Sequence, residues 1–128
     1  MEAPPVTGEA KTGTRVLLVD DNVDALQTLH VLLDMQGFEV QSFATPDEAI
    51  AQAPTFRPEV CVLDIGLPGM DGYELARRLQ AQGLRARYVA LTGYGQASDR
   101  ERSAAAGFHV HLTKPVQLDP LLDALKPL

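Results

Sequence analysis

The sequence predicts an α/β fold, a parallel sheet with helices on both of its faces. Strand-like and helix-like segments alternate five times along the 128 residues, an order typical of parallel strands joined by right-handed crossovers. The apolar run from Val60 to Leu63 is too short for a helix and rich in β-branched residues, which indicates a central strand buried on both faces. The run ends on Asp64 before a Gly/Pro-rich loop. The sequence therefore places an acid at the sheet edge where open α/β proteins bind ligands.

The chain divides into a short tail, residues 1–14, and one folded domain, residues 15–128. The tail contains two prolines and two glycines with little that is apolar, and is expected to be a flexible end or linker. The predicted segments of the domain are, in chain order, a strand at 15–19, a helix at 22–36, a strand at 38–43, a helix from 46 that ends before Pro54, the strand at 60–63, a helix from 72 to Gly83, a strand at 87–91, a helix from Ser98 to Gly107, a strand at 108–112 and a helix from about Gln117.

Local signals support each helix. In the first helix leucines recur at helical spacing, and Gly37 supplies a stop. The second follows Thr45 with proline at its first position and Glu48 three residues after the cap. Asp71 is expected to cap the third helix, and the segment from Ser98 to Glu101 is a second capping box, opening the fourth. The last helix repeats leucine at helical spacing.

The composition excludes several classes of function. A net charge of -6 argues against binding nucleic acid through a basic face. No apolar run reaches membrane-spanning length and no signal-peptide core is present, so the cytoplasm is the expected location. The single cysteine, Cys61, lies inside the apolar run and is expected to be a buried, inert thiol. Arginines such as Arg102 are expected to form solvated faces.

Polar side chains follow four of the predicted strands. They are Asp20, Asp21, Asp64, Thr92 and Lys114. Because parallel strands end at one edge of a sheet, these groups are expected to meet there. Three neighbouring carboxylates repel one another and need a cation, and Mg²⁺ suits oxygen ligands of this kind. Lysine and threonine suit the oxygens of a phosphoryl group, and Asp64 is the best candidate for a nucleophile that forms an aspartyl phosphate.

Four motifs together resemble the receiver domain of two-component response regulators. They are Leu18-Val19-Asp20-Asp21-Asn22, the segment from Leu63 to Gly72, Leu91-Thr92-Gly93 and Thr113-Lys114-Pro115. The resemblance extends from about Arg15 to the end of the chain. It implies a flavodoxin-like (βα)5 fold with strand order 2-1-3-4-5. It also implies a cis peptide between Lys114 and Pro115.

The resemblance also implies a mechanism and partners. Asp64 would accept a phosphoryl group from a phosphohistidine on a sensor histidine kinase or phosphotransfer domain, and would lose it slowly without a separate phosphatase. Asp21, Asp64 and the carbonyl of Gly66 would hold Mg²⁺, with Asp20 acting mainly through water. Thr92 and Lys114 would bind the phosphoryl oxygens. Docking or homodimerisation is expected through the fourth helix, fifth strand and fifth helix, with no binding of nucleic acid or membrane by this domain.

Three positions depart from the common receiver pattern. His111 occupies the place, three residues before the lysine, where most receivers have an aromatic residue that moves with the threonine. It is either a titratable version of that switch or an ordinary half-exposed strand histidine. Gly66 and Tyr94 lie two residues after the acid and the threonine, so the rate of dephosphorylation stays open.

Two other functions compete with the receiver. A phosphohydrolase of the haloacid-dehalogenase type would need an acid where Gly66 stands and a cap that excludes water. An interaction domain that retains only the fold would not need the acidic and basic set. The tail and the His-Leu-Thr-Lys-Pro sequence near the end also look like the C-terminal receivers of hybrid sensor kinases. An origin in such a protein is favoured over a stand-alone regulator.

Overall fold

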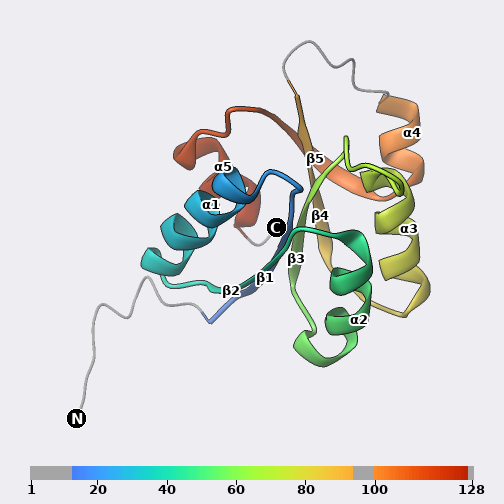
Figure 1. Ribbon diagram of the computed structural model, residues 1–128, viewed down its shortest axis with the longest axis horizontal. Coiled ribbons are helices and arrows are strands. Elements are labelled where there is room, and N and C mark those ends of the chain that lie inside the picture. Colours follow the sequence, from blue (N-terminus) through green and yellow to red (C-terminus); the bar gives the residue numbers. More distant parts are fainter. Residues whose placement is uncertain (1–12, 94–99, 127–128) are drawn as a thin grey trace.

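The fold is a three-layer α/β sandwich, seen in a computed structural model that describes residues 13–93 and 100–126 (Figure 1). The described elements are β1 (Arg15–Val19), α1 (Val23–Met35), β2 (Glu39–Phe43), α2 (Pro46–Phe56), β3 (Val60–Asp64), α3 (Gly72–Ala81), β4 (Arg87–Thr92), α4 (Arg100–Ala105), β5 (Phe108–Thr113) and α5 (Leu118–Leu125). All strand pairs are parallel and the strand order is β2-β1-β3-β4-β5. The order predicted from the receiver resemblance is therefore confirmed. Of the predicted tail, residues 1–14, all but Gly13 and Thr14 lie outside the described residues.

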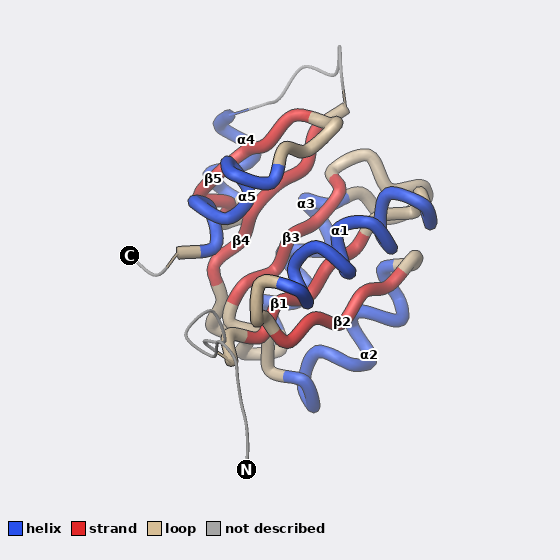
Figure 2. Tube along the Cα trace, turned by 90° about the vertical axis from the view of Figure 1, so that its left-hand side faces the viewer, coloured by secondary structure: helices blue, strands red, loops and turns tan. Residues whose placement is uncertain are grey.

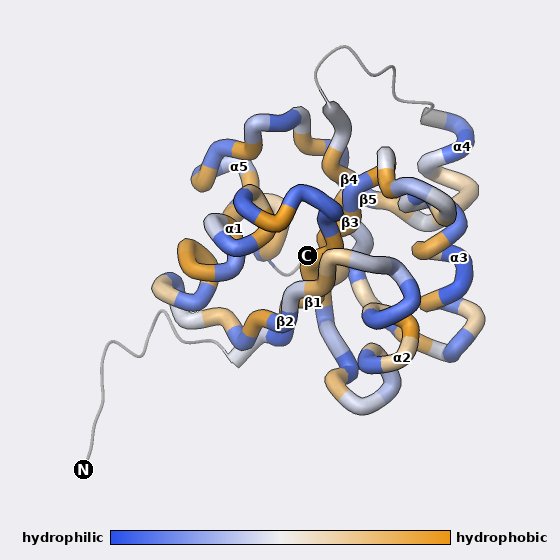
Figure 3. The backbone as a smooth tube through the Cα atoms, viewed as in Figure 1, coloured by the Kyte–Doolittle hydropathy of each residue, from blue (hydrophilic) through white to orange (hydrophobic). Residues whose placement is uncertain are grey.

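Helices cover both faces of the sheet, with α1 and α5 on one side and α2, α3 and α4 on the other (Figures 1 and 2). Successive side chains of a strand point to opposite faces, so β1 supplies Leu17 and Val19 to one core and Val16 and Leu18 to the other. The central strand β3 is buried along its whole length, and the central strands are coloured hydrophobic in Figure 3. Because both faces of β3 are buried, its sequence is a continuous apolar run and does not alternate between apolar and polar residues.

Helix α2 does not end before Pro54, so that prediction was wrong. The helix continues to Phe56 with Pro54 inside it. Proline cannot donate a backbone hydrogen bond to the carbonyl four residues earlier, which here belongs to Ile50. That carbonyl instead accepts a hydrogen bond of 3.0 Å from the side-chain amide of Gln82. A partner distant in the sequence therefore removes part of the cost of the proline. The helix ends after Phe56, where the capping residue Arg57 has a left-handed backbone with φ 55°.

Two of the predicted helix caps are present. Thr45 accepts a hydrogen bond from the backbone N–H of Glu48 in α2, and Asp71 accepts one from Glu74 in α3. Asn22, which is predicted to lie inside the first helix, instead caps α1 by accepting the backbone N–H of Ala25. The predicted capping box begins at Ser98, which lies outside the described residues, and Tyr94 lies outside them too. None of the described helices is both long and apolar enough to cross a membrane.

Gly72, the first residue of α3, packs directly against the backbone of the central strand. A Cβ atom at this position would lie 2.6 Å from the carbonyl oxygen of Asp64 and 2.7 Å from the Cα of Ile65. Both are backbone atoms that cannot rotate away. Gly72→Ala is therefore expected to lower the free energy of unfolding by about 3 kcal/mol, at the upper end of the cost of overpacking, as measured by urea denaturation.

The matched control for this substitution is Gly69→Ala in the same loop. Gly69 has φ +81° and no atom within 4 Å of a built Cβ. This substitution is expected to cost only the strain of a left-handed residue, about 1 kcal/mol. Equal losses in the two variants would show that the loop moves to make room for the added Cβ, and that contact with the strand carrying Asp64 does not explain the glycine at position 72.

Candidate functional site

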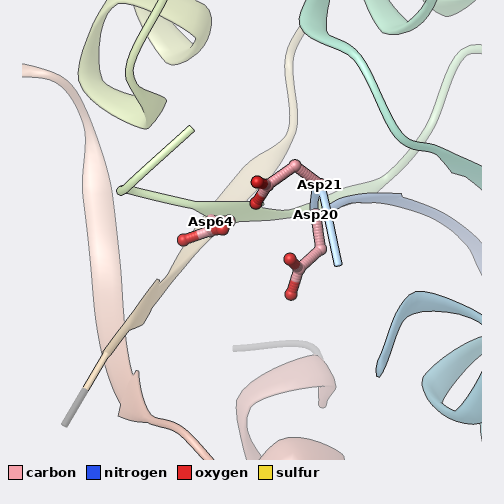
Figure 4. A group of neighbouring side chains, drawn as sticks. All are labelled: Asp20, Asp21 and Asp64. Atoms are coloured by element: carbon pink, nitrogen blue, oxygen red, sulfur yellow. The ribbon is translucent and has the colours of Figure 1, made fainter. Parts of the chain in front are cut away.

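The structure brings the predicted groups together at the carboxyl edge of the sheet. Asp20 and Asp21 follow β1, whereas Asp64 and Thr92 end β3 and β4, and Lys114 follows β5. The register aligns these strand ends, since Asp64 lies beside Leu91 and Thr92 beside Thr113. One carboxylate oxygen from each of Asp20, Asp21 and Asp64 lies within 4.8 Å of the others. Figure 4 shows the three acids as neighbours, two after β1 and one on β3.

Lys114 forms ion pairs with two of these acids. Its Nζ lies 3.1 Å from Oδ2 of Asp20 and 3.0 Å from Oδ2 of Asp64. The backbone N–H of Lys114 donates to the carbonyl oxygen of Thr92 at 2.8 Å, which fixes the lysine beside the end of β4. The peptide between Lys114 and Pro115 is cis, as the receiver resemblance implies. The lysine thus places a positive charge in contact with the predicted nucleophile.

Burial and charge pull the ionisation of this cluster in opposite directions. Asp20 is only 2% exposed, and this burial raises its pKa, although the backbone N–H of Asn22 at 3.0 Å and the ammonium group of Lys114 favour its charged form. Burial lowers the pKa of Lys114, but the ion pairs with Asp64 and Asp20 outweigh that effect and leave the pKa raised. Lys114 pairs with two of the three carboxylates, so the negative charge of the cluster exceeds the charge of this cation and the cluster attracts further positive charge.

The donor set fits a hard divalent cation. Carboxylate oxygens are the ligands that Mg²⁺ uses in proteins, generally with several waters retained. Asp21 is exposed while Asp20 and Asp64 are buried, so the cluster is open to solvent on one side. One oxygen of Asp64 accepts the backbone N–H of Gly66 at 2.9 Å, and the other pairs with Lys114. The acid is thereby held in one orientation, with Gly66 directly beside it.

The Thr92 hydroxyl forms its hydrogen bond with β5. It donates to the carbonyl oxygen of Leu112 in β5 at 3.4 Å, and Thr92 is 5% exposed. His111, the preceding residue on β5, is half-buried, and its ring centroid lies 6.4 Å from that of Phe108. Both interpretations of His111 fit this placement, so its role as a switch stays a prediction.

One connection at this edge, between α4 and the start of α3, has no counterpart among the predicted site residues. Arg102 of α4 pairs with Asp71 at 2.9 Å, and its guanidinium carbon lies 4.4 Å from the centre of the Tyr73 ring. An arginine in a polar helix has no local pattern that distinguishes it from a solvated one. The predicted capping role of Asp71 is confirmed, but the second oxygen of this carboxylate also binds α4.

Comparison with known proteins assigns the family. A family model of the response regulator receiver domain matches residues 16–126. The chain belongs to this family. Receiver domains are phosphorylated on an aspartate, bind Mg²⁺ at an acidic pocket and interact with histidine kinases or phosphotransfer proteins. The chain is thus a receiver of two-component signalling, as the four motifs predict.

Individual relatives agree with the family and its fold. This receiver domain is 29% identical over 112 residues to sporulation initiation phosphotransferase F of Bacillus subtilis, covering 88% of this chain and 90% of that protein. It is 35% identical over 117 residues to transcriptional regulatory protein PrrA of Mycobacterium tuberculosis, covering 91% of this chain but only 50% of that protein. The structure of chemotaxis protein CheY4 of Vibrio cholerae aligns with a TM-score of 0.81 at 28% identity, over 88% of this chain and 95% of that one.

Proposed function

We propose that Asp64 is the aspartate on which this receiver is phosphorylated. The observation that carries the proposal is the position of its carboxylate, 3.0 Å from Lys114 and within 4.8 Å of the acids after β1. An oxygen of Asp64 attacks the phosphorus of a phosphohistidine, forming a P–O bond as the P–N bond breaks. The electron pair of the P–N bond stays with the departing imidazole nitrogen, which takes a proton from solvent, and an aspartyl phosphate remains.

The surrounding side chains divide the remaining tasks. We assign the ligation of Mg²⁺ to Asp21, Asp64 and the carbonyl of Gly66, with Asp20 acting through water. When bound, the metal would neutralise negative charge on the phosphoryl oxygens. Lys114 is already in contact with Asp64 and would hold one phosphoryl oxygen. The Thr92 hydroxyl would have to break its hydrogen bond to the carbonyl of Leu112 in order to donate to another phosphoryl oxygen.

The expected movement of Thr92 would break the hydrogen bond between the ends of β4 and β5, beside His111. We therefore propose that phosphorylation alters the surface formed by α4, β5 and α5, which would dock an effector or a second copy of the chain. Slow loss of the phosphoryl group by reaction with water would reset the receiver.

The partner that donates the phosphoryl group is proposed to approach along α1. A hollow of about 690 Å³ lies elsewhere, over α3, but one of about 640 Å³ between α1 and the segment after β5 is lined by Asp20 and Lys114 themselves. Among the described residues, the large exposed apolar side chains are Val23, Val31 and Met35, all on α1. A helix carrying the phosphohistidine, on a kinase or phosphotransfer domain, fits this combination of apolar surface and open site.

The domain bounds, the parent protein and its location in the cell are also proposals. We propose residues 15–128 as the receiver and 1–14 as a linker, within a hybrid sensor kinase. The chain spans half of PrrA but 90% of sporulation initiation phosphotransferase F, so its relatives include longer proteins as well as short ones. A phosphohistidine is made from ATP, so we place the receiver in the cytoplasm.

The proposal is tested by incubating the protein with acetyl phosphate and mapping the label by mass spectrometry. The expected result is one acyl phosphate in the peptide containing Asp64, cleaved by hydroxylamine and by base, which forms with Mg²⁺ and does not form when EDTA is added beforehand. A label on another residue, or one whose yield does not depend on Mg²⁺, would contradict the assignment. Rapid turnover of small phosphate esters would instead favour the phosphohydrolase.

A further inference from the structure

We propose that Arg102 is a positioning residue for the phosphorylation site, acting from α4 through Asp71. It would hold the loop between β3 and α3, which includes Gly66, in the conformation that binds the metal. This inference rests on the proposed function, because it concerns the same metal and the same acceptor. It assigns a role to a side chain that touches neither.

The first link is the ion pair between α4 and the start of α3. A guanidinium nitrogen of Arg102 lies 2.9 Å from Oδ2 of Asp71. The other carboxylate oxygen, Oδ1, accepts the backbone N–H of Glu74 at 2.9 Å. Asp71 therefore uses one oxygen to cap α3 and the other to bind α4. A displacement of α4 would pull on the residue at which the loop becomes helix.

The second link fixes the arginine itself. Its guanidinium carbon lies 4.4 Å from the centre of the Tyr73 ring, within the range of a cation–π contact. Tyr73 is 4% exposed, and its hydroxyl lies 3.3 Å from that of the fully buried Ser103. The ring also packs edge-on against Phe108 of β5 at 6.0 Å. Arg102 thus rests on a rigid surface made by α3, α4 and β5.

The third link joins Asp71 to the acceptor. The next residue, Gly72, donates its N–H to the carbonyl of Ile65 at 3.0 Å and has no space for a Cβ against Asp64. The start of α3 therefore cannot move without moving the end of β3. Gly66 lies within this short closed loop, and its N–H is bound to the Asp64 carboxylate. The position of α4 and the geometry of the metal ligands are in this way mechanically connected.

The expected size of the effect follows from exposure. The side chains of Arg102 and Asp71 are 49% and 34% exposed, and such an ion pair alone changes an equilibrium by up to about fivefold. The stacking on Tyr73 restricts the arginine and supports the upper end of that range. We therefore expect a change of about fivefold in the dissociation constant for Mg²⁺ when the link is removed.

A purely electrostatic effect of Arg102 on Mg²⁺ affinity would have the opposite sign to the effect of a positioning role. The two explanations can therefore be distinguished by experiment. Loss of a positive charge near the site should tighten Mg²⁺ binding, and loss of a negative charge should weaken it. A positional role predicts that Arg102→Gln and Asp71→Asn both weaken binding, because both release the loop. Asparagine is itself a good helix cap, so the second variant removes the ion pair while keeping the cap.

The experiment measures Mg²⁺ affinity by calorimetric titration of the wild type, both single variants and the double variant. The expected result is about a fivefold weaker affinity in each single variant and no further loss in the double variant, as for two residues in one interaction. Arg102→Lys should recover part of the affinity. Arg78→Gln is the matched control, since Arg78 is an exposed arginine on α3 that pairs with Glu74, and binding should be unchanged or slightly tighter.

Tighter binding in Arg102→Gln, or additive losses in the double variant, would overturn the proposal. Urea unfolding of each variant shows whether a changed affinity accompanies loss of the fold, and a loss of affinity that only tracks a lowered unfolding midpoint would also overturn it. Wild-type labelling of Asp64 with acetyl phosphate separates the two levels of inference. If the wild type is labelled and binds Mg²⁺ but Arg102→Gln behaves identically, only the positioning role fails.

Discussion

Replacing Asp64 with asparagine is expected to reduce phosphoryl uptake from acetyl phosphate by a factor on the order of 10³ or more, as removal of a nucleophile does in enzymes. Asparagine has the same shape, and its side-chain oxygen can still accept the N–H of Gly66, which binds Asp64 at 2.9 Å. Its amide lacks the second anionic oxygen that now faces Lys114 at 3.0 Å. The expected loss is therefore chemical, with the fold retained.

The rate of acyl phosphate formation, followed by mass spectrometry at saturating Mg²⁺, measures this effect. Asp71→Asn is the matched control, because it makes the same change in the same loop at a residue that caps α3. It should be labelled at close to the wild-type rate once Mg²⁺ is saturating. Substantial labelling of Asp64→Asn at a neighbouring acid would mean that Asp20 or Asp21 can replace the proposed nucleophile.

The site could be predicted from the sequence because its residues follow strands whose order forces them together. Asp20, Asp64 and Thr92 each come directly at or after an apolar segment, and adjacent parallel strands place such positions at one edge. The strand order alone therefore predicts that these residues form one site. The same logic places Lys114, since β5 pairs with β4 in a register that sets Thr113 beside Thr92.

The features that the sequence did not reveal depend on contacts between distant segments. Pro54 lies within α2, and the carbonyl left without its usual donor is bound by Gln82, more than thirty residues away. The Thr92 hydroxyl is bound to the carbonyl of Leu112 rather than to the acids, a choice between rotamers that no local pattern encodes. Arg102 acquires a role only because α4 packs beside α3. In each case tertiary contact decides what local propensity leaves open.

Replacing Lys114 with methionine is expected to lower the free energy of unfolding by about 3 kcal/mol at neutral pH without metal, the lower end of the cost of breaking a buried ion pair. The lysine has two carboxylate partners, and the side chains of Asp20 and Asp64 are only 2% and 6% exposed. Methionine keeps the apolar part of the side chain but leaves both acids without their cation. Lys126→Met is the control, because Lys126 and its partner Asp123 are each 73% exposed, and it should change stability by less than about 1 kcal/mol.

The difference between wild type and Lys114→Met should depend on pH in a defined direction. The folded-state pKa of Lys114 is raised above its ordinary value of 10.5, so its contribution is fully present below that pH and is lost as the pH rises through the raised value. The pKa of Asp20 is also raised, from 3.8, so the ion pair loses an anion as the pH falls through that raised value toward 3.8. Urea unfolding across pH should therefore show a plateau of maximal difference between these limits.

Magnesium should reverse part of this loss, because the lysine and the metal compete for the same carboxylates. Wild-type Asp20 and Asp64 have an ammonium group 3.1 and 3.0 Å away, which repels an incoming divalent cation. Lys114→Met should therefore bind Mg²⁺ more tightly than the wild type, and its unfolding midpoint should rise more steeply with added Mg²⁺. An identical dependence on Mg²⁺ in both proteins would mean that the metal binds away from the acids that Lys114 holds. The aspartates would then be a structural ion-pair cluster rather than the metal site of a receiver.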